Sequence, residues 1–216
     1  MSDAMNNSEQ RKIWKGSFGD EYVDRSKSIE SVNKRFLESR GISLEDIIKY
    51  FFSDIDRNYT ILELGCNVGL NLSILKKLGF KKLSGVEINK KAYEIASENN
   101  PEIKFYNSSI EEFNTNEKYD LVFTAGVLIH VNPQSMPYIV SKIIKLSNKY
   151  IFGLEYYSEN TVEISYRGIQ NSCWKQDFPQ HFLDNGNLDL VKKKIIPYKN
   201  ETDTDIAYLL KKMNES

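Results

Sequence analysis

The segment Thr60–Leu72, with the sequence TILELGCNVGLNL, constrains the fold of this chain more than any other. A short apolar run carries Glu63 near its end and is followed by a loop with Gly65 and Gly69. The leucines that follow recur at a spacing that puts them on one side of a helix. The segment therefore predicts a strand over about 60–65, a tight turn, and a helix over about 69–79.

A strand, a glycine turn and a helix in this order form half of a nucleotide site. Glycine lets a ligand approach the backbone, and the helix N-terminus offers unpaired N–H groups to an anionic part of the ligand. The other half is an acidic residue at the end of the next strand, about 20 residues on, which binds ribose hydroxyls. Glu87 ends an expected strand over 82–87 and meets that requirement.

The loop differs from that of pyrophosphate binders. Cys66 and Asn67 stand where such proteins have the glycine that lets a pyrophosphate touch the backbone. S-adenosylmethionine has no phosphate and carries a sulfonium, an amino group and a carboxylate, and Glu63 beside the loop suits that mixture. The segment resembles the first motif of class I S-adenosylmethionine-dependent methyltransferases, so S-adenosylmethionine is the expected cofactor. The alternative is a plain sheet turn with an accidental glycine pair.

Bulk properties narrow the class of protein. With 216 residues, the chain fits one structural domain, in which 1–58 form an N-terminal lid and helices on a core of 59–216. A net charge of −1 argues against nucleic acid or an anionic membrane as partner. Two distant cysteines give no metal-ligand spacing, so no metal is expected. No apolar run approaches the ~18 residues of a membrane span, and the expected location is cytoplasmic.

Alternation of apolar strand and helix patterns continues along the chain. Helices are expected over 29–39 and 44–52, the second capped by Ser43, and a helix begins near Asn89. Further strands are expected at Phe105, after Tyr119 and over 150–157, and two strand-like runs over about 188–196 and 205–212 read as a closing hairpin. The expected fold is α/β: a Rossmann-like, seven-stranded sheet, mostly parallel, with an antiparallel C-terminal hairpin.

The N-terminal region is unusually aromatic. Residues 1–12 are polar and expected to fray. Trp14, Phe18 and Tyr22 follow at intervals of four, among glycines and charges. They either form a lid or pocket wall, or simply fasten an N-terminal helix to the body. Helices over 29–39 and 44–52 are expected to cover the sheet or the mouth of the cofactor site.

Further motifs are spread over nearly the whole chain. They are Gly16–Tyr22 (GSFGDEY), Leu62–Leu72 (LELGCNVGLNL), Gly85–Asn89 (GVEIN), Phe123–His130 (FTAGVLIH), Glu155–Ser158 (EYYS), Tyr166–Gly168 (YRG) and Asp177–Phe178. Together these motifs resemble the pseudaminic acid biosynthesis-associated methylase family. The resemblance implies a bacterial cytoplasmic enzyme linked to nonulosonic-acid sugars of surface glycans.

The resemblance also implies a set of cofactor-binding residues. Those around the methionine part are Glu63, Gly65, Asn67 and Gly69, and the ribose falls to Glu87. Adenine falls to Ser109 and Ile110, and the floor below the sulfonium to Thr124, Ala125 and Gly126; Cys66 and Ile88 complete the set. Asp120, at the start of its strand and far from that floor, is expected to be structural.

The acceptor side is less defined by motif. His130 is the candidate catalytic base for a hydroxyl acceptor, since its pKa suits neutral pH; the alternative is a packed, hydrogen-bonded histidine. Arg167 suits a carboxylate or phosphate, or else pairs with Glu163 on the surface. The candidate substrate-binding residues are Trp14, Tyr22, Arg25, Glu155, Tyr156, Tyr157, Tyr166 and Arg167.

These residues predict methyl transfer to an oxygen or nitrogen atom of a small anionic acceptor, a sugar acid or a nucleotide-linked sugar. One alternative is a methyltransferase of another small molecule or of a macromolecule, against which the balanced charge stands. Others are a nicotinamide-dependent oxidoreductase, against which the missing glycine stands, and a cofactor-binding module without catalysis. The oligomeric state stays open.

Overall fold

The computed structural model describes residues 8–24, 28–199 and 203–213. The helices are α1 (Ser8–Lys15), α2 (Ser17–Val23), α3 (Ile29–Arg40), α4 (Leu44–Phe51), α5 (Leu70–Lys77), α6 (Lys90–Asn99), α7 (Met136–Leu146) and α8 (Phe178–Asn185). The strands are β1 (Thr60–Leu64), β2 (Lys82–Glu87), β3 (Lys104–Asn107), β4 (Tyr119–Ala125), β5 (Ser147–Tyr156), β6 (Val162–Tyr166), β7 (Ile169–Lys175), β8 (Leu188–Pro197) and β9 (Thr204–Lys212).

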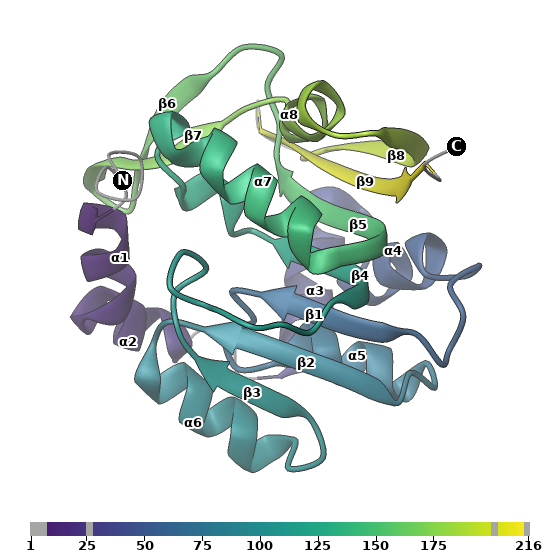
Figure 1. Cartoon of the computed structure of the whole chain (residues 1–216). Coiled ribbons are helices and arrows are strands. Elements are labelled where there is room, and N and C mark those ends of the chain that lie inside the picture. The colour runs from purple at the N-terminus through teal and green to yellow at the C-terminus, as the bar shows by residue number, and fades with distance from the viewer. Residues whose placement is uncertain (1–7, 25–27, 200–202, 214–216) are drawn as a thin grey trace.

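Seven of the strands form one sheet in the order β3-β2-β1-β4-β5-β9-β8 (Figure 1). Neighbours from β3 to β5 pair in parallel, while β9 pairs antiparallel with both β5 and β8. The expected fold, mostly parallel with an antiparallel C-terminal hairpin, is confirmed. Because the first five strands run in one direction, their carboxyl ends share one edge of the sheet.

Alternate residues of the central strands face opposite sides of the sheet. Ile61 of β1 and Leu121 of β4 pack into a core with α4 and α5. Leu62 and Val122, one position further along each strand, pack into a second core with α7 and α8. Both faces are therefore covered, as expected for parallel strands with near-continuous apolar runs.

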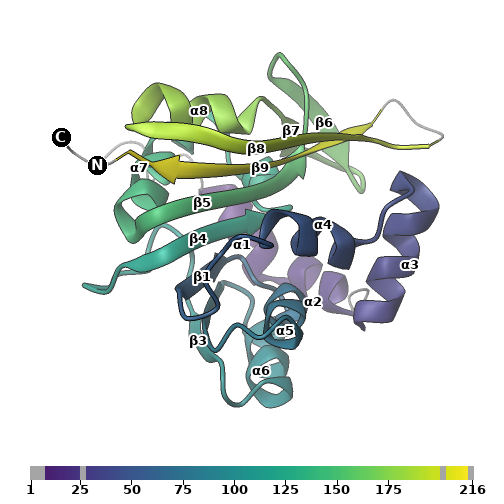
Figure 2. The ribbon, with the colours of Figure 1, turned by 90° about the vertical axis from the view of Figure 1, so that its right-hand side faces the viewer.

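Local signals account for most helix boundaries. Ser43 accepts the backbone N–H of Asp46 at 3.0 Å and caps α4, as expected. Asn89 accepts the N–H of Ala92 at 2.9 Å and caps α6. Gly41 ends α3 in the left-handed conformation with φ 77°. In Figure 2, α3 and α4 lie next to each other, with β5 and β9 above α4.

Two features of the chain differ from the expectations. The polar N-terminus is helical from Ser8, so fraying up to residue 12 is wrong for the described part. Between β5 and β8, the chain forms the antiparallel hairpin β6–β7 and the helix α8, which the sequence did not predict. The hairpin pairs only with itself and carries mixed polar and aromatic residues, so its strands lack the apolar runs of the central sheet.

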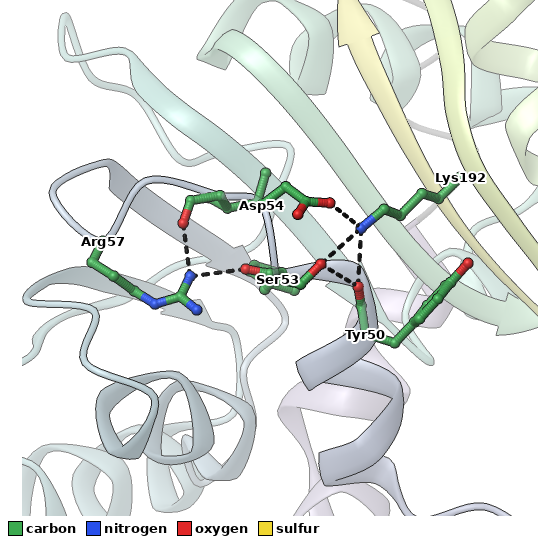
Figure 3. A network of polar contacts seen from close by, with 7 residues as sticks. Tyr50, Ser53, Asp54, Arg57 and Lys192 are labelled. Carbon is green, nitrogen blue, oxygen red and sulfur yellow. Dashed lines mark hydrogen bonds and ion pairs between the residues drawn. The ribbon is translucent and has the colours of Figure 1, made fainter.

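The turn between α4 and β1 is fastened to the edge of the sheet. Figure 3 shows Lys192 of β8 reaching this turn, where its ammonium donates to the carbonyl of Tyr50, to Ser53 Oγ and to Asp54 Oδ2 at 3.1, 3.0 and 2.7 Å. Arg57 donates to the backbone carbonyls of Phe52, directly after α4, and of Ile55, in the turn itself. These contacts hold α4 against β9 and thereby help to position the neighbouring α3.

Asp120 lies at the amino end of β4, at the edge opposite to the shared carboxyl ends. Its Oδ2 accepts both the backbone N–H and the hydroxyl of Thr60, at 3.0 and 3.1 Å, and Lys149 lies 3.2 Å from Oδ1. Burial raises the pKa of Asp120, but these hydrogen bonds outweigh it, and the net shift is downward. The side chain joins the starts of β1 and β4.

Asp120→Ala should lower the free energy of unfolding by about 1–3 kcal/mol, because the Thr60 N–H loses its acceptor in a partly buried place. Urea denaturation measures the change. Asp189→Ala, at an exposed position of β8, is the control and should stay within about 0.5 kcal/mol. Equal stability of the two variants would contradict the structural role of Asp120.

Candidate functional site

A cavity of about 490 Å³ lies at the edge where the parallel strands end. The loops after β1, β2, β3 and β4 form one side, and residues of α1, α2, α3, β5, β9 and the β6–β7 hairpin contribute to the other walls. Figure 1 shows α1 and α2 beside the ends of β1 and β2, with the hairpin above them. The strand order reverses between β1 and β4, and ligands of open α/β sheets bind at such a point.

The loop after β1 is pinned to its neighbours. The N–H groups of Gly65 and Cys66 both donate to the carbonyl of Val86, at 2.8 and 3.0 Å. Gly65 has φ 73°, and a Cβ added there would lie 2.6 Å from Cγ2 of Val127. Both the backbone conformation and the close approach therefore require glycine at this position.

Glu63 is fully buried behind this loop. Its Oε1 accepts the side-chain amide of Asn71 at 2.6 Å, and its Oε2 has no hydrogen-bond partner among the described residues. Burial raises the pKa of Glu63 well above its usual value, against the effect of the Asn71 hydrogen bond. Asn71 lines the cavity, whereas Glu63 stands behind it.

Glu87 lines the cavity at the end of β2. Its Oε2 accepts the N–H of Asn67 at 2.7 Å, and its Oε1 accepts the N–H of Asn89 at 2.8 Å. Burial raises the pKa of Glu87, and these backbone hydrogen bonds oppose the shift. Asn67 has φ 48°, a left-handed conformation that asparagine tolerates, so its N–H can point at the carboxylate.

The two N-terminal helices are tied to the start of α6. The side-chain amide of Asn89 donates to the carbonyl of Trp14 at 3.2 Å and to Oδ1 of Asp20 at 2.7 Å. Lys91 pairs with Asp24 at 3.0 Å. Since Asn89 also binds Glu87, one asparagine connects the covering helices to the acidic end of β2.

His130 lies in the turn after β4 and is buried against aromatic rings. The ring centroid of Trp14 is 4.5 Å away and that of Tyr166 is 4.8 Å away. Nδ1 is 2.7 Å from the carbonyl of Ser172, which can only accept, so Nδ1 carries the proton and Nε2 the lone pair. Burial lowers the pKa of His130 to about 4, although the Ser172 hydrogen bond acts the other way.

Glu155 lies near the end of β5 and holds the same turn. Its Oε2 accepts the N–H of Val127 at 2.9 Å, and Oε1 has no partner among the described residues. Burial raises the pKa of Glu155 to about 7, opposed by hydrogen bonds from Thr124 and from backbone N–H groups of the turn. Glu155 thus lines the cavity and, through its hydrogen bond to Val127, supports the turn that carries His130.

Arg167 is exposed at the tip of the β6–β7 hairpin and lines the cavity. Its guanidinium carbon lies 5.8 Å from the ring centroid of Tyr22 and 5.5 Å from that of Tyr166. Glu163 accepts the backbone N–H of Asn171 at 2.8 Å, and no ion pair joins it to Arg167 within the described chain. The surface pairing that the sequence left open is therefore not formed.

Most of the residues singled out in the sequence meet in this cavity. Those that line it are Trp14, Tyr22, Gly65, Cys66, Asn67, Glu87, Ile88, Ser109, Ile110, Ala125, Gly126, His130, Glu155, Tyr156, Tyr166 and Arg167. Glu63, Gly69, Thr124 and Tyr157 lie outside the lining. Arg25 lies outside the described residues.

Sequence reasoning missed one wall of the cavity. Five residues of α3 line it, at intervals of three and four that mark one side of a helix. We call this side the α3 face: Val32, Arg35, Phe36, Ser39 and Arg40. The sequence indicated only that this helix covers the sheet or the cofactor mouth, because a helical pattern with two arginines equally fits a solvated surface.

Two kinds of feature are not found in the described residues. They hold no group of three or more histidine, cysteine or acidic side chains arranged to bind a metal. None of the helices of this part of the chain is long and apolar enough to cross a bilayer.

The methyltransferase domain family matches residues 61–149, which run from β1 into β5. This stretch includes the loop after β1, Glu87, and the turn with His130. This part of the chain is therefore similar to a methyltransferase domain, and the seven-stranded sheet that contains it has the fold of class I methyltransferases.

Individual relatives are similar over part of the chain. The ribosomal protein L11 methyltransferase of Dictyoglomus thermophilum is 30% identical over 115 residues, which cover 50% of this chain and 35% of that protein. The malonyl-[acyl-carrier protein] O-methyltransferase 1 of Ilyobacter polytropus is 28% identical over 95 residues, 42% of this chain and 35% of that protein. The chain thus spans about a third of the length of these curated relatives.

Solved structures share the fold at low identity. The magnesium protoporphyrin IX methyltransferase from Synechocystis PCC 6803, solved with bound S-adenosylmethionine, superposes with a TM-score of 0.69. The superposition covers 96% of this chain and 97% of that one, at 14% identity. At this identity the likeness extends to the fold alone.

The raised pKa of Glu155 predicts how the melting temperature of the protein depends on pH. Folded Glu155 holds a proton up to about pH 7, whereas an unfolded glutamate releases it near 4.5. Its contribution is therefore fully present below pH 4.5 and is lost as the pH rises through 7. Glu155→Gln cannot titrate, so its stability lacks this pH-dependent loss. The melting temperature of the variant minus that of the wild type should therefore increase as the pH rises from 4.5 to 7.5. Parallel melting curves over that range would contradict the assignment.

Proposed function

We propose that this protein transfers a methyl group from S-adenosylmethionine to an oxygen or nitrogen atom of a small anionic acceptor. The geometry of Glu87 carries the proposal. Each of its oxygens accepts one backbone N–H, from Asn67 and Asn89, so the carboxylate has a fixed orientation at the cavity wall. Each carboxylate oxygen keeps a second lone pair that can accept another hydrogen bond. The two adjacent hydroxyls of a ribose can donate to these two oxygens, one to each.

The other cofactor contacts follow from the lining of the cavity. Adenine would lie at Ser109 and Ile110, and the sulfonium over Ala125 and Gly126. The methionine end would lie at the loop after β1. There we assign direct contact with the methionine part to the loop and to Asn71. Glu63 does not line the cavity and orients Asn71 through their 2.6 Å hydrogen bond.

Methyl transfer is an in-line displacement in which the acceptor atom attacks the methyl carbon and S-adenosylhomocysteine leaves. Holding the two reactants in line supplies much of the acceleration. For a hydroxyl acceptor, we assign the departing proton to Nε2 of His130, which carries the lone pair. Burial lowers the pKa of His130 to about 4, below the near-neutral value expected from the sequence, so the imidazole is neutral at physiological pH but is a weaker base than expected.

The proposed acceptor is a sugar acid or a nucleotide-linked sugar, in keeping with the family of nonulosonic-acid biosynthesis that the chain resembles. Support comes from the mixture of aromatic rings and cations that line the same cavity as Glu87. Tyr22 and Tyr166 flank the guanidinium of Arg167, and Trp14 and Tyr156 line the same cavity. Rings of this kind suit the apolar faces of a sugar, and the arginines that line the cavity suit its carboxylate or phosphate.

We further propose that 1–58 act as a lid and supporting helices on a core of 59–216, within one domain. Support comes from the contacts of Trp14, whose carbonyl binds Asn89 and whose ring lies 4.5 Å from that of His130. A cover held at both places excludes water from the reacting atoms.

Calorimetric titration of S-adenosylhomocysteine tests the cofactor assignment. The wild type should bind it and should give no heat with NADH. Glu87→Gln should weaken binding by roughly 10–100-fold, because two hydrogen bonds to a charged group are lost or weakened. Glu117→Gln, an exposed acid whose side chain is 61% accessible, is the matched control and should bind like the wild type. Equal affinity of the Glu87 and Glu117 variants would overturn the assignment.

Mass spectrometry of nucleotide-sugar extracts tests the acceptor. Cells without the gene should accumulate a species lighter by one methyl group than its counterpart in cells with the gene. Incubating that species with purified protein and S-adenosylmethionine should restore the missing mass. Identical extracts from the two cell types would exclude this acceptor class while leaving the cofactor titration unaffected.

A further inference from the structure

The α3 face forms a wall of the cavity that the cofactor contacts proposed above do not use. Three further residues line the cavity next to the α3 face: Tyr156 of β5, Tyr198, and Asp205 of β9. The rings of Tyr156 and Tyr198 meet edge to face, with centroids 6.2 Å apart. This part of the cavity therefore combines aromatic walls with two arginines of α3.

Arg40 is held rigidly in this wall. Its guanidinium carbon lies 4.1 Å from the ring centroid of Phe36 and 4.0 Å from that of Tyr198. Nε donates to Oδ2 of the buried Asp205 at 2.5 Å, and Nη1 donates to Ser39 Oγ at 2.9 Å. The Tyr198 hydroxyl accepts from Nη2. A guanidinium has five N–H groups, so two remain to be satisfied.

Arg35 stands five residues before Arg40, at the opposite margin of the α3 face. It is exposed, lines the cavity, and has no ion-pair partner in the part of the chain that the structure describes. Asp205 is 2% exposed and compensates one positive charge, that of Arg40. The α3 face thus carries one positive charge that no ion pair compensates, that of Arg35. The guanidinium of Arg40, in the same wall, already has a fixed orientation.

We propose that the α3 face, with Tyr156 and Tyr198, is the subsite for the anionic group of a sugar-like ligand, with a carboxylate or phosphate bound between Arg35 and Arg40. This inference rests on the proposed function and deepens it, because it names the place where the acceptor's negative charge is held. Arg40 provides fixed N–H groups, and Arg35 closes over the anion from the mouth of the cavity. The rings of Phe36 and Tyr198 hold the guanidinium of Arg40, and the ring of Tyr156, which meets that of Tyr198 edge to face, packs against the ring of the ligand.

The α3 face is better prepared for this role than the hairpin tip. Arg167 is exposed, lies at a positive φ of 55°, and is 5.5–5.8 Å from its neighbouring rings. Arg40 is only 11% exposed and is fixed by a buried carboxylate and two rings. Less side-chain entropy is lost when an anion binds to a guanidinium that is already fixed.

Calorimetry of the full chain with glucuronate, glucose 6-phosphate and neutral glucose tests the subsite, with and without saturating S-adenosylhomocysteine. At least one of the two anions should bind the wild type roughly tenfold or more tightly than glucose, and Arg35→Gln should remove that advantage. Arg40→Lys keeps a charge beside Asp205 but loses the planar fork, and should weaken anion binding less than Arg35→Gln weakens it. The stronger of the two anions distinguishes a carboxylate subsite from a phosphate subsite.

Lys34→Gln is the control, since Lys34 is a neighbouring cation whose side chain is 78% exposed and which does not line the cavity. It should leave the affinity for all three probes unchanged. The proposal is wrong if neither anion outbinds glucose, if Arg35→Gln binds like the wild type, or if only Arg167→Gln abolishes the preference. Failure of S-adenosylhomocysteine to bind, in the same titrations, would instead count against the proposed function.

Discussion

Three buried glutamates at one end of the sheet organise the cavity. Glu63, Glu87 and Glu155 are 0%, 7% and 1% exposed, and burial raises the pKa of each. Glu87 and Glu155 are compensated by backbone N–H groups of the loops after β1, β2 and β4. The loops are thereby drawn onto the carboxylates, so the shape of the cavity follows from the need to satisfy these buried groups.

The fold and the part of the cavity formed by the ends of β1 and β2 were predictable because their signals are local. Gly65 and Glu63 lie within one short segment, and Glu87 follows at the spacing of one helical crossover. In a parallel sheet, the ends of successive strands meet at one edge, so residues 20 positions apart become hydrogen-bonded neighbours, as the 2.7 Å contact between Asn67 and Glu87 shows.

The α3 face and its partners were not predictable, because they join distant parts of the chain. Arg40 and Asp205 are 165 positions apart, and nothing in either local pattern distinguishes a paired from a solvated charge. The β6–β7 hairpin was not predicted either, because it forms a sheet separate from the main one. Its strands therefore do not show the apolar alternation of a buried face.

The position of Trp14 connects the two halves of the cavity. Its carbonyl is bound to Asn89, beside the carboxylate of Glu87, while its indole rests against His130. One residue of α1 therefore touches both the start of α6, next to Glu87, and the turn after β4. The indole and the carbonyl of Trp14 fix the spacing between these two parts of the cavity wall, which follow different strands of the sheet.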